Sequence, residues 1–533
     1  MILVAQFLKT LLSFGAQAEV TYEPMEPTEP SRGKSYRVGK GVSCLVPFLV
    51  LGVATWWTSS LRAQEAKQLN MLYVGVEANI DSVRDGAKSY EEKTGVHINI
   101  DSYPQTEWRE RMFTEIAAKS PHYDIWIIDV PEGALVANHS VNLLDLILNP
   151  AVVDSKLLSP ETFIPRLIVQ STYDPKHTWN PPMELQMPTY TWQGPVSMET
   201  FQKMKADGLG FYGIPFHPNV LVLAYRKDYF DNPDYQARFK TKYGYDLAPP
   251  EDWKQFVDVA SFFTKSINSN SPTEYGCTLM AKKHESLYCD WRTWLGSYGV
   301  FEIGTDMVPS FNSEKGIEAT QFYKDLMDKY KVVPQAAKTW TWDEVTTAFG
   351  SGLTAMAMNY HRMLLDPAIE QKGGQAGFAM VPGERQADGK ITRAPHYGSY
   401  YLALNKYATH QQSAYKFIEW LASPDVQRSF AKYQFHSSRR DYYQDPAVLS
   451  KWPEYWKPFE ESLEIGYSRP RLTVFRQYSE TIQAEVSAAL LGNKTVKQAL
   501  DDAACEVIDL FKQAGYYEAL HVDPYTKQPQ CKH

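Results

Sequence analysis

Runs of hydrophobic residues divide the chain after residue 66 into alternating predicted strands and helices. An apolar run begins at Leu69, and the stretch behind it has apolar residues at helical spacing and ends at Gly95. A second stretch of helical spacing, 108–120, leads into the continuous apolar run 123–130, which is typical of a buried parallel strand. This β-α-β order predicts an α/β lobe with right-handed crossovers.

Polar residues stand directly after two of these predicted strands. Glu77 and Asn79 follow the first strand, and Asp129 ends the strand within 123–130. Because ligands meet the carboxyl ends of the strands in such sheets, the three side chains are candidate ligand contacts. A purely structural alternative is that Asn79 or Asp81 caps the helix that follows.

The same patterns continue toward the C-terminus. A Gly-Ile-Pro turn at 213–215 precedes a strongly apolar predicted strand, and the last third of the chain is mostly helical. Predicted helices lie at 248–266, 289–299, 315–334, 410–433 and 479–515. The stretch 171–198 is rich in loop residues, and it either extends the rim of a cleft or covers a lobe.

Length, charge and aromatic content narrow the class of protein. A chain of 533 residues is long for one compact domain, which favours two or more lobes around separate cores. The net charge is −8 and basic residues form no long run, which argues against a nucleic-acid partner, because such a partner requires clustered Lys and Arg. The 34 Tyr and 14 Trp residues fit either large apolar cores or a cleft that stacks flat, partly apolar ligands such as sugars.

The N-terminal residues 1–66 differ from the rest and are excluded from the fold prediction. A charged region precedes the apolar run 44–57 and small residues follow it, which predicts a signal peptide cleaved near Ala63. The run is shorter than the ~20 residues that span a bilayer comfortably. Residues 1–18 also resemble an export signal, and Met25 is the expected initiator. We therefore expect an exported, periplasmic protein.

Four cysteines follow the predicted signal peptide, and an even count in an exported chain suggests disulfides. Pairing of sequence neighbours would give two bonds, Cys277–Cys289 and Cys505–Cys531. The connectivity stays open at this point, and four free buried thiols are the alternative. Because the chain has no Cys-x-x-Cys pair and no His-rich ligand spacing, we expect no metal site and no cofactor.

The segment 349–363 changes character halfway along. A Gly-Ser-Gly turn leads into a small, apolar, strand-like run, which stops at the four hydrogen-bonding residues Asn359, Tyr360, His361 and Arg362. Either a strand leaves the core into an ordinary polar loop, or a buried strand delivers these side chains to a site.

These landmarks follow one another in an order that resembles one protein family. The run "AFGSGLTAMAMNY" resembles the F-x-x-G-x-x-A-M signature of that family. Its successive helices, strands and crossings are matched by 89–100, 123–130, 212–230, 249–256, 380–384, 398–406, 414–433 and 489–503. Over nearly everything after the signal peptide, the chain resembles the bacterial ABC-transporter extracellular solute-binding proteins of family 1, the carbohydrate-binding group that includes maltose-binding protein.

The resemblance implies an α/β fold of two lobes, the type II periplasmic-binding-protein fold, with hinge strands joining the lobes around a central ligand cleft. It assigns 67–217 and 361–402 to lobe 1, 218–360 and 403–520 to lobe 2, and 521–533 to a C-terminal tail. The strand that ends at Asn359 and Tyr360 would leave one lobe and deliver its polar residues to the cleft or its hinge.

By position in the family's motifs, the resemblance also implies a set of ligand contacts in the cleft. The set comprises Glu77, Asn79, Asp129, Asn219, Tyr288, Trp291, Tyr360, His361, Arg362, Tyr397, Ser399, Tyr400 and Tyr478. Carboxylates and amides would bind sugar hydroxyls, and Tyr or Trp rings would stack on the C–H faces of the sugar. Core packing is the alternative for any single aromatic residue. Arg362 departs from the family pattern and makes a preference for neutral sugars less secure.

The function implied by the resemblance is that of the solute-binding component of an ABC importer. Such a protein binds a sugar, oligosaccharide or polyol and delivers it to a permease in the inner membrane; we expect a monomer without catalytic residues. An exported solute sensor with the same fold is one alternative. A more distant one is a secreted glycoside hydrolase using a pair such as Glu77 and Asp129. The candidate residues suit a neutral sugar, a polyol or an acidic sugar alike.

Overall fold

The fold is described from a computed structural model, which covers residues 66–75, 80–179, 195–360, 374–450 and 453–532. Several predictions lie outside these described residues. They are the export signal with Met25 and Ala63, and the candidate contacts Glu77, Asn79, His361 and Arg362.

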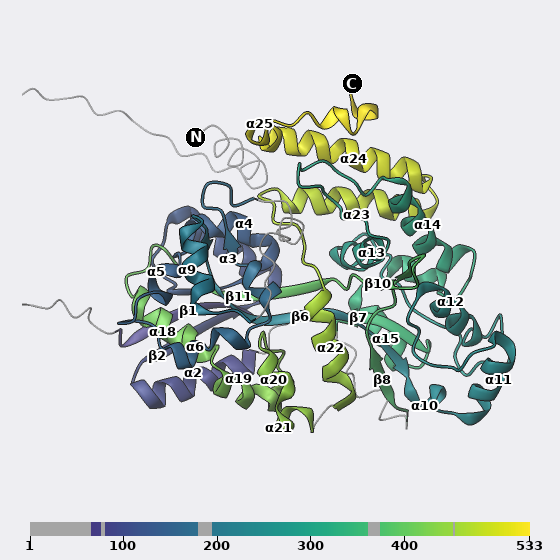
Figure 1. Cartoon of the computed structure of the whole chain (residues 1–533), viewed down its shortest axis with the longest axis horizontal. Helices are drawn as coiled ribbons and strands as arrows, with labels where there is room; N and C mark the ends of the chain where they lie inside the picture. The colour runs from purple at the N-terminus through teal and green to yellow at the C-terminus, as the bar shows by residue number, and fades with distance from the viewer. Residues whose placement is uncertain (1–65, 76–79, 180–194, 361–373, 451–452, 533) are drawn as a thin grey trace, which may run out of the picture. The chain divides into compact units, whose positions relative to one another are not determined.

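Seven strands of the described residues form one mixed sheet in the order β2–β1–β3–β11–β6–β7, with β8 also pairing with β6 (Figure 1). The strands are β1 (Gln68–Val74), β2 (His97–Tyr103), β3 (Ile125–Asp129), β6 (Ile214–Arg226), β7 (Met356–Tyr360), β8 (Ala376–Ala379) and β11 (Tyr397–Leu404). As the β-α-β pattern predicts, β1 pairs in parallel with both β2 and β3. β11 is antiparallel to its neighbours β3 and β6.

The long strand β6 runs from one hydrophobic core into another. Its first half, from Ile214 to Val220, pairs with β11, and its second half pairs with β7 and β8. Ile214 is buried in the first core, whereas Leu221 and Leu223 are buried in the second. β6 therefore crosses between the two cores, as expected of a hinge strand.

The first core packs helices against β1, β2, β3 and β11. Its longer helices are α2 (Ile80–Thr94), α3 (Gln105–Ala118), α9 (Met198–Ala206) and α18 (Gln411–Leu421). Beyond the end of α2, Gly95 has φ +75°, a left-handed conformation that favours glycine, so the predicted end of this helix is confirmed. α3 begins before its predicted start, directly after Pro104.

The second core is larger and mostly helical. Its longer helices are α11 (Pro233–Tyr243), α12 (Trp253–Phe262), α13 (Glu285–Ser297), α14 (Glu314–Asp328), α15 (Trp342–Gly350), α22 (Pro453–Ile465), α23 (Phe475–Leu491) and α24 (Val496–Gln513). In Figure 1, α23 and α24 lie side by side. α13 is an internal helix, because every residue from Ser286 to Ser297 is buried. Among the described residues, no helix is both long enough and apolar enough to cross a membrane.

Membership of the two cores differs from the predicted lobe boundaries. The apolar face of α18 and the ring of Phe435 are buried in the first core, although the prediction assigns 403–520 to lobe 2. Val381 lies in the range 361–402 that is predicted for lobe 1, but it is buried in the second core. The hydrophobic pattern identifies such helices and strands, but it does not say which core covers their apolar faces.

The structure contains one of the two disulfides considered from the sequence. Cys505 of α24 is bonded to Cys531, which ties the C-terminal tail to this helix. Cys277 and Cys289 are free, buried thiols, so the predicted bond between them is wrong. Both lie inside the second core, where a thiol packs as a small hydrophobic residue.

Candidate ligand-binding site

Asp129 stands at the last position of β3, at the carboxyl end of the parallel strands. The chain then turns into the short 3-10 helix η1 (Val130–Glu132), with Pro131 in its first turn. The side chain of Asp129 is 1% exposed, and its Oδ1 accepts a hydrogen bond from Nη2 of Arg469 at 2.6 Å. A carboxylate buried this deeply requires a charged or hydrogen-bonded partner, and Arg469 supplies it.

A second partner of Arg469 comes from the other core. Arg469 lies in the segment 466–474, between α22 and α23, and its Nη1 donates to Oε1 of Glu285 in the first turn of α13. The segment is held against β11, where the amide of Tyr397 donates to the carbonyl of Tyr467 at 3.2 Å. Arg469 thereby joins a carboxylate at the edge of the first core to one at the edge of the second.

Two further ion pairs surround this bridge. Arg109 of α3 pairs with Glu132 of η1, and both side chains are largely buried. Arg476, in the first turn of α23, lies 4.0 Å from Glu132 and is half exposed. We call the six residues together the charge cluster: Arg109, Asp129, Glu132, Glu285, Arg469 and Arg476.

The pKa values of Asp129 and Glu285 are shifted in opposite directions. Burial raises the pKa of Asp129 to about 7, against the opposing effect of Arg469. Burial also disfavours the charge of Glu285, but Arg469 and Arg109 outweigh it and hold the pKa of Glu285 below its usual value. Asp129 is therefore poised to gain or lose a proton near neutral pH.

Two polar atoms at the centre of the cluster have no hydrogen-bond partner among the described residues. They are Oδ2 of Asp129 and Nε of Arg469. Their side chains are 1% and 7% exposed, and buried polar groups in proteins are nearly always paired. Because one atom is an acceptor and the other a donor, hydroxyl groups, which both donate and accept, suit this pair.

Tyr360, a predicted contact at the end of β7, lies beside the cluster. Its hydroxyl is 2.8 Å from Nδ1 of His396 and also interacts with the thiol of Cys289. Burial, reinforced by Arg292 and Arg469, holds the pKa of His396 well below its usual value, so this ring is neutral. The partly exposed tyrosine and the neutral histidine add uncharged polar groups to the site.

The predicted contacts on β11 support the site more than they line it. Tyr400 stands opposite Asp129 in the β3–β11 ladder and is buried in the first core. Tyr397 is buried in the second core, and Ser399 accepts a hydrogen bond from Gln170 at 2.7 Å. These three side chains therefore pack inside the protein, while their strand fixes the end of β3.

Three aromatic residues predicted to stack on a ligand lie inside the second core. Tyr288, Trp291 and Tyr478 are all 0% exposed. The two tyrosine hydroxyls donate to Glu302, and the indole of Trp291 donates to Thr320 at 2.8 Å. The structure favours core packing for all three, because Tyr288 of α13 packs against Tyr478 of α23, while Trp291 packs against Phe311.

Two asparagines near the site bind other parts of the protein. Oδ1 of the predicted contact Asn219 lies 2.8 Å from Nδ1 of His436. Asn359 is fully buried and donates from Nδ2 to the carbonyl of Trp342 at 2.9 Å. Because successive side chains of a strand point to opposite faces, Asn359 faces α15 while Tyr360 faces the other way. Asn359 therefore belongs to the packing of β7 on α15, beside the crossing strand β6, and it is not a contact of the charge cluster.

Asp129 is the only residue of the charge cluster that the sequence predicts as a ligand contact, and the other five are not among the predicted contacts. Arg469 is 340 positions from Asp129 and 184 from Glu285, so no local spacing links the three. The available signal is the stretch "SRPRLTVF", in which two arginines precede an apolar run without helical or strand periodicity. No three His, Cys, Asp or Glu side chains in the described ranges are placed to hold a metal ion.

The middle of the chain, residues 177–428, matches the model of a family described as bacterial extracellular solute-binding protein. Over these residues, the family resemblance inferred from the sequence is confirmed. The match includes β6, β7, β11 and α13, and α13 carries Glu285 of the charge cluster, while Asp129 and Arg469 lie on either side of the match.

Two curated relatives are similar to the chain at low identity. A probable amino-acid ABC transporter periplasmic-binding protein of Sinorhizobium fredii is 22% identical over 273 residues, which cover 50% of this chain and 59% of the relative. An erythritol/L-threitol-binding protein of Mycolicibacterium smegmatis is 22% identical over 345 residues, which cover 62% of each chain. The chain thus spans about three fifths of the length of these relatives.

Solved structures establish the fold. The maltose-bound MalE3 of T. maritima superposes with a TM-score of 0.63 at 21% identity, covering 83% of this chain and 99% of that one. A solute-binding protein of Agrobacterium radiobacter K84 in complex with ribitol gives a TM-score of 0.60 at 19% identity, covering 83% and 98%. The chain has the two-lobed, type II fold of periplasmic binding proteins.

Proposed function

We propose that the protein is the exported solute-binding component of an ABC importer, and that it binds a sugar, an oligosaccharide or a polyol between its lobes for delivery to a membrane permease. The charge cluster carries this proposal: Arg469 draws together carboxylates from both cores, beside a buried acceptor and a buried donor without described partners. The names of the relatives, which include a tetritol-binding protein and an ABC transporter periplasmic-binding protein, support the same class.

The geometry supplies a mechanism for binding. A ligand hydroxyl would donate to Oδ2 of Asp129, and a ligand oxygen would accept from Nε of Arg469. Because Asp129 and Glu285 belong to different cores, a ligand held at the cluster favours the arrangement in which both cores contribute to it. That arrangement is the one a permease would recognise.

We further propose that the site binds without catalysing hydrolysis. Glycoside hydrolysis uses one protonated and one ionised carboxyl on either side of the scissile bond. Asp129 instead has one oxygen engaged by Arg469, which favours a role in hydrogen bonding over a role as nucleophile or acid. The family description, solute-binding protein, supports the same assignment.

A thermal-shift screen tests the proposal. The purified protein is heated with maltose, ribitol, D-mannitol, erythritol, sugar acids and, because one relative is named as an amino-acid binder, the common amino acids. A ligand at 100 times its Kd stabilises the fold by about 2.7 kcal/mol, which gives a visible shift. We expect a shift with a sugar or polyol. A shift with amino acids alone, or turnover of a glycoside, would contradict the proposal.

A further inference from the structure

Arg469 occupies a special place in the charge cluster, because it donates to carboxylates that belong to two different cores. Nη2 binds Asp129 and Nη1 binds Glu285. The guanidinium also lies against Gly398 of β11, where an added Cβ would be in ordinary contact with Nη2 of Arg469, at 3.6 Å. The side chain is thus held in one orientation by carboxyl groups on two elements, β3 and α13.

This orientation leaves two defined atoms without protein partners. With Oδ1 of Asp129 engaged, Oδ2 is the remaining acceptor, and with Nη1 and Nη2 of Arg469 engaged, Nε is a remaining donor without a partner among the described residues. Both side chains are more than nine-tenths buried, so solvent does not easily satisfy either atom. This acceptor and this donor are held in place by one ion pair, so each can form a hydrogen bond with a hydroxyl group of a ligand.

The charges of the buried part of the cluster leave no free cation. Its carboxyl groups belong to Asp129, Glu132 and Glu285, and its guanidinium groups to Arg109 and Arg469. Each guanidinium is paired with at least one of these carboxyl groups, so a ligand carboxylate or phosphate entering here would meet spare negative charge and no unpaired positive charge.

We infer that Arg469 is the positioning residue of the proposed site: it orients Asp129 so that Oδ2 accepts a ligand hydroxyl. Because Asp129 and Glu285 both pair with it, it offers no unpaired cation to an acidic ligand, and the site favours uncharged polyhydroxylated ligands. This inference rests on the proposed function. Arg469 acts partly through Asp129, so its role is visible in how binding depends on the ionisation of Asp129.

Charged or titratable groups face Asp129 from every described element packed against it. They are Arg469 from 466–474, Glu285 from α13, Glu132 from η1, Arg109 from α3 and Tyr401 from β11. The two arginines lower the pKa of Asp129 and the two glutamates raise it. Tyr401 stays protonated, since burial raises its own pKa well above the usual value. A hydroxyl that donates to Asp129 binds its ionised form, so affinity falls as pH drops through about 7.

Calorimetric titration of two variants tests the inference. The ligand is whichever of ribitol, D-mannitol or maltose binds the wild-type protein, and the titrations run between pH 5.5 and 8.5. Arg469→Gln removes a group that lowers the pKa of Asp129, so the midpoint of the affinity profile moves to higher pH. Glu285→Gln removes a group that raises it, so the midpoint moves to lower pH. At pH 7, Arg469→Gln also loses roughly tenfold or more in affinity, the usual weight of a charged hydrogen-bond partner.

Two further variants separate positioning from structural support. Arg469→Lys keeps the charge and returns the midpoint toward that of the wild type. Arg471→Gln is the matched control, because Arg471 lies in the same segment, is equally buried, and binds the carbonyl groups of Val169 and Thr172 instead of Asp129. This control lowers the unfolding temperature without moving the midpoint.

The outcomes that overturn the inference are distinct from those that overturn the proposed function. If the wild-type protein binds a polyol or sugar but Glu285→Gln and Arg469→Gln keep its pH midpoint, the role of Arg469 is wrong while the function stands. If Arg469→Gln does not fold, the pH midpoint of ligand affinity in Glu285→Gln alone tests the role of Arg469. Stronger binding of a sugar acid than of the matching neutral sugar would also refute it. If the wild-type protein binds no member of the panel, the proposed function fails and the inference fails with it.

Discussion

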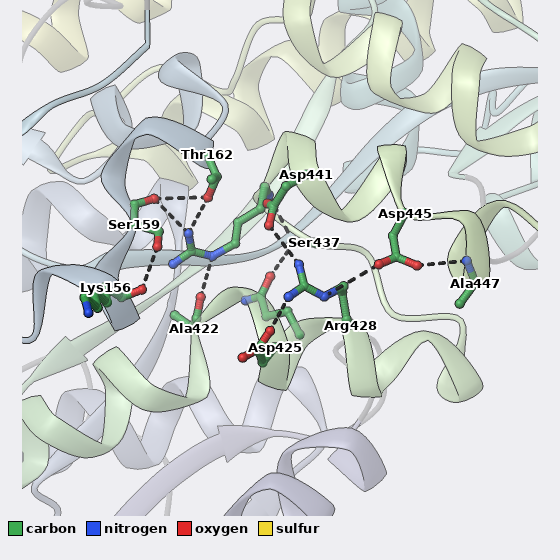
Figure 2. A network of polar contacts seen from close by, with 12 residues as sticks. Lys156, Ser159, Thr162, Ala422, Asp425, Arg428, Ser437, Asp441, Asp445 and Ala447 are labelled. Atoms are coloured by element: carbon green, nitrogen blue, oxygen red, sulfur yellow. Dashed lines mark hydrogen bonds and ion pairs between the residues drawn. The ribbon is translucent and has the colours of Figure 1, made fainter.

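Arg439 and Arg469 are both buried guanidinium groups, but the first binds neutral partners and the second binds charged ones. Arg439 donates to the carbonyl groups of Leu158, Ser159 and Ala422 and to the hydroxyl of Thr162. Ser159 and Thr162 come from one stretch of chain and Ala422 from the end of α18, and all three are labelled in Figure 2. These carbonyl groups end α18 and the short helix α6 (Ser155–Leu158), so Arg439 satisfies helix ends in the first core.

The partners determine how each arginine behaves. Burial without a bonded carboxylate lowers the pKa of Arg439 to about 9. Burial also acts to lower the pKa of Arg469, but Asp129 and Glu285 raise it well above the usual value. Arg439 holds together elements of a single core, whereas Arg469 bridges two cores and leaves polar atoms unmatched. The first arrangement is typical of structural support, and the second is typical of a site that awaits a ligand.

The largest expected effect is on stability and comes from Arg439. Arg439→Met removes the donors of several buried carbonyl groups and should lower the free energy of unfolding by about 3–5 kcal/mol, measured by urea denaturation. The matched control is Arg428→Met, because Arg428 is partly exposed and pairs with Asp425, Asp441 and Asp445 at the surface (Figure 2). That control should lose less than about 1 kcal/mol. Equal losses in the two variants would contradict a structural role that is special to Arg439.

Arg469→Gln should have a smaller effect on stability. The variant leaves Asp129 buried without its cation, but a carboxyl group whose pKa is about 7 can take up a proton at modest cost. We expect the free energy of unfolding without ligand to fall by about 1–3 kcal/mol at pH 7, the cost of an unpaired buried polar group, and not by the ~3–5 kcal/mol that is usual when a buried ion pair loses one charge. A loss as large as that of Arg439→Met would show that Arg469 is mainly structural and would remove the contrast between them.

A buried carboxyl group in the first core should make the free energy of unfolding depend on pH. Burial raises the pKa of Glu419 of α18 to about 7, well above its value in an unfolded chain. The folded protein therefore holds an extra proton between about pH 4.5 and 7, and stability falls as pH rises through that window. Glu419→Gln should flatten the decline by about 1 kcal/mol in urea denaturation. An unchanged slope would contradict the assignment.

The smallest expected effect concerns the thiol of Cys289, next to the site. Burial raises the pKa of Cys289 to about 12, so it should resist labelling by a thiol reagent at pH 8 in the folded protein. Arg469→Gln loosens the neighbouring bridge and should speed labelling several-fold, followed by mass spectrometry of the peptide containing Cys289. Arg439→Met should speed labelling only as far as global unfolding does. If labelling speeds up by the same factor for each kcal/mol of unfolding free energy lost in the two variants, the acceleration reflects global unfolding and not a local effect at the site.

The elements around Asp129 were accessible to sequence reasoning because their signals are local. The apolar run 123–130 predicts a buried strand, and the strand observed ends at Asp129. Gly95 predicts the end of α2 for the same reason, since one residue with positive φ suffices to stop a helix there. A polar residue after a parallel strand is a site candidate whatever the rest of the chain does.

The partners of Asp129 were not accessible, because they are set by long-range packing. The stretch "SRPRLTVF" marks the surroundings of Arg469 as unusual, but no local pattern indicates that its partners lie 184 and 340 positions away. The prediction for α13 fails in the opposite way, because it places ligand contacts where the structure has a core. Its stretch contains Tyr288 and Trp291, which suggest stacking on a ligand, but a helix buried on all sides turns every aromatic residue into core. Charged residues in such a helix are the available warning, since Arg292 is fully buried against Glu302.

The most direct test of a solute site at the charge cluster is the affinity for the best polyol or sugar of the screen, measured by calorimetry in two aspartate variants at opposite ends of β3. Asp129→Asn alters the carboxylate that meets Arg469, whereas Asp124→Asn alters a largely buried carboxylate that binds the amide of Asn70. A site at the cluster predicts a loss of roughly tenfold or more in Asp129→Asn and wild-type affinity in Asp124→Asn. Undiminished binding by Asp129→Asn would place the ligand elsewhere and contradict the account.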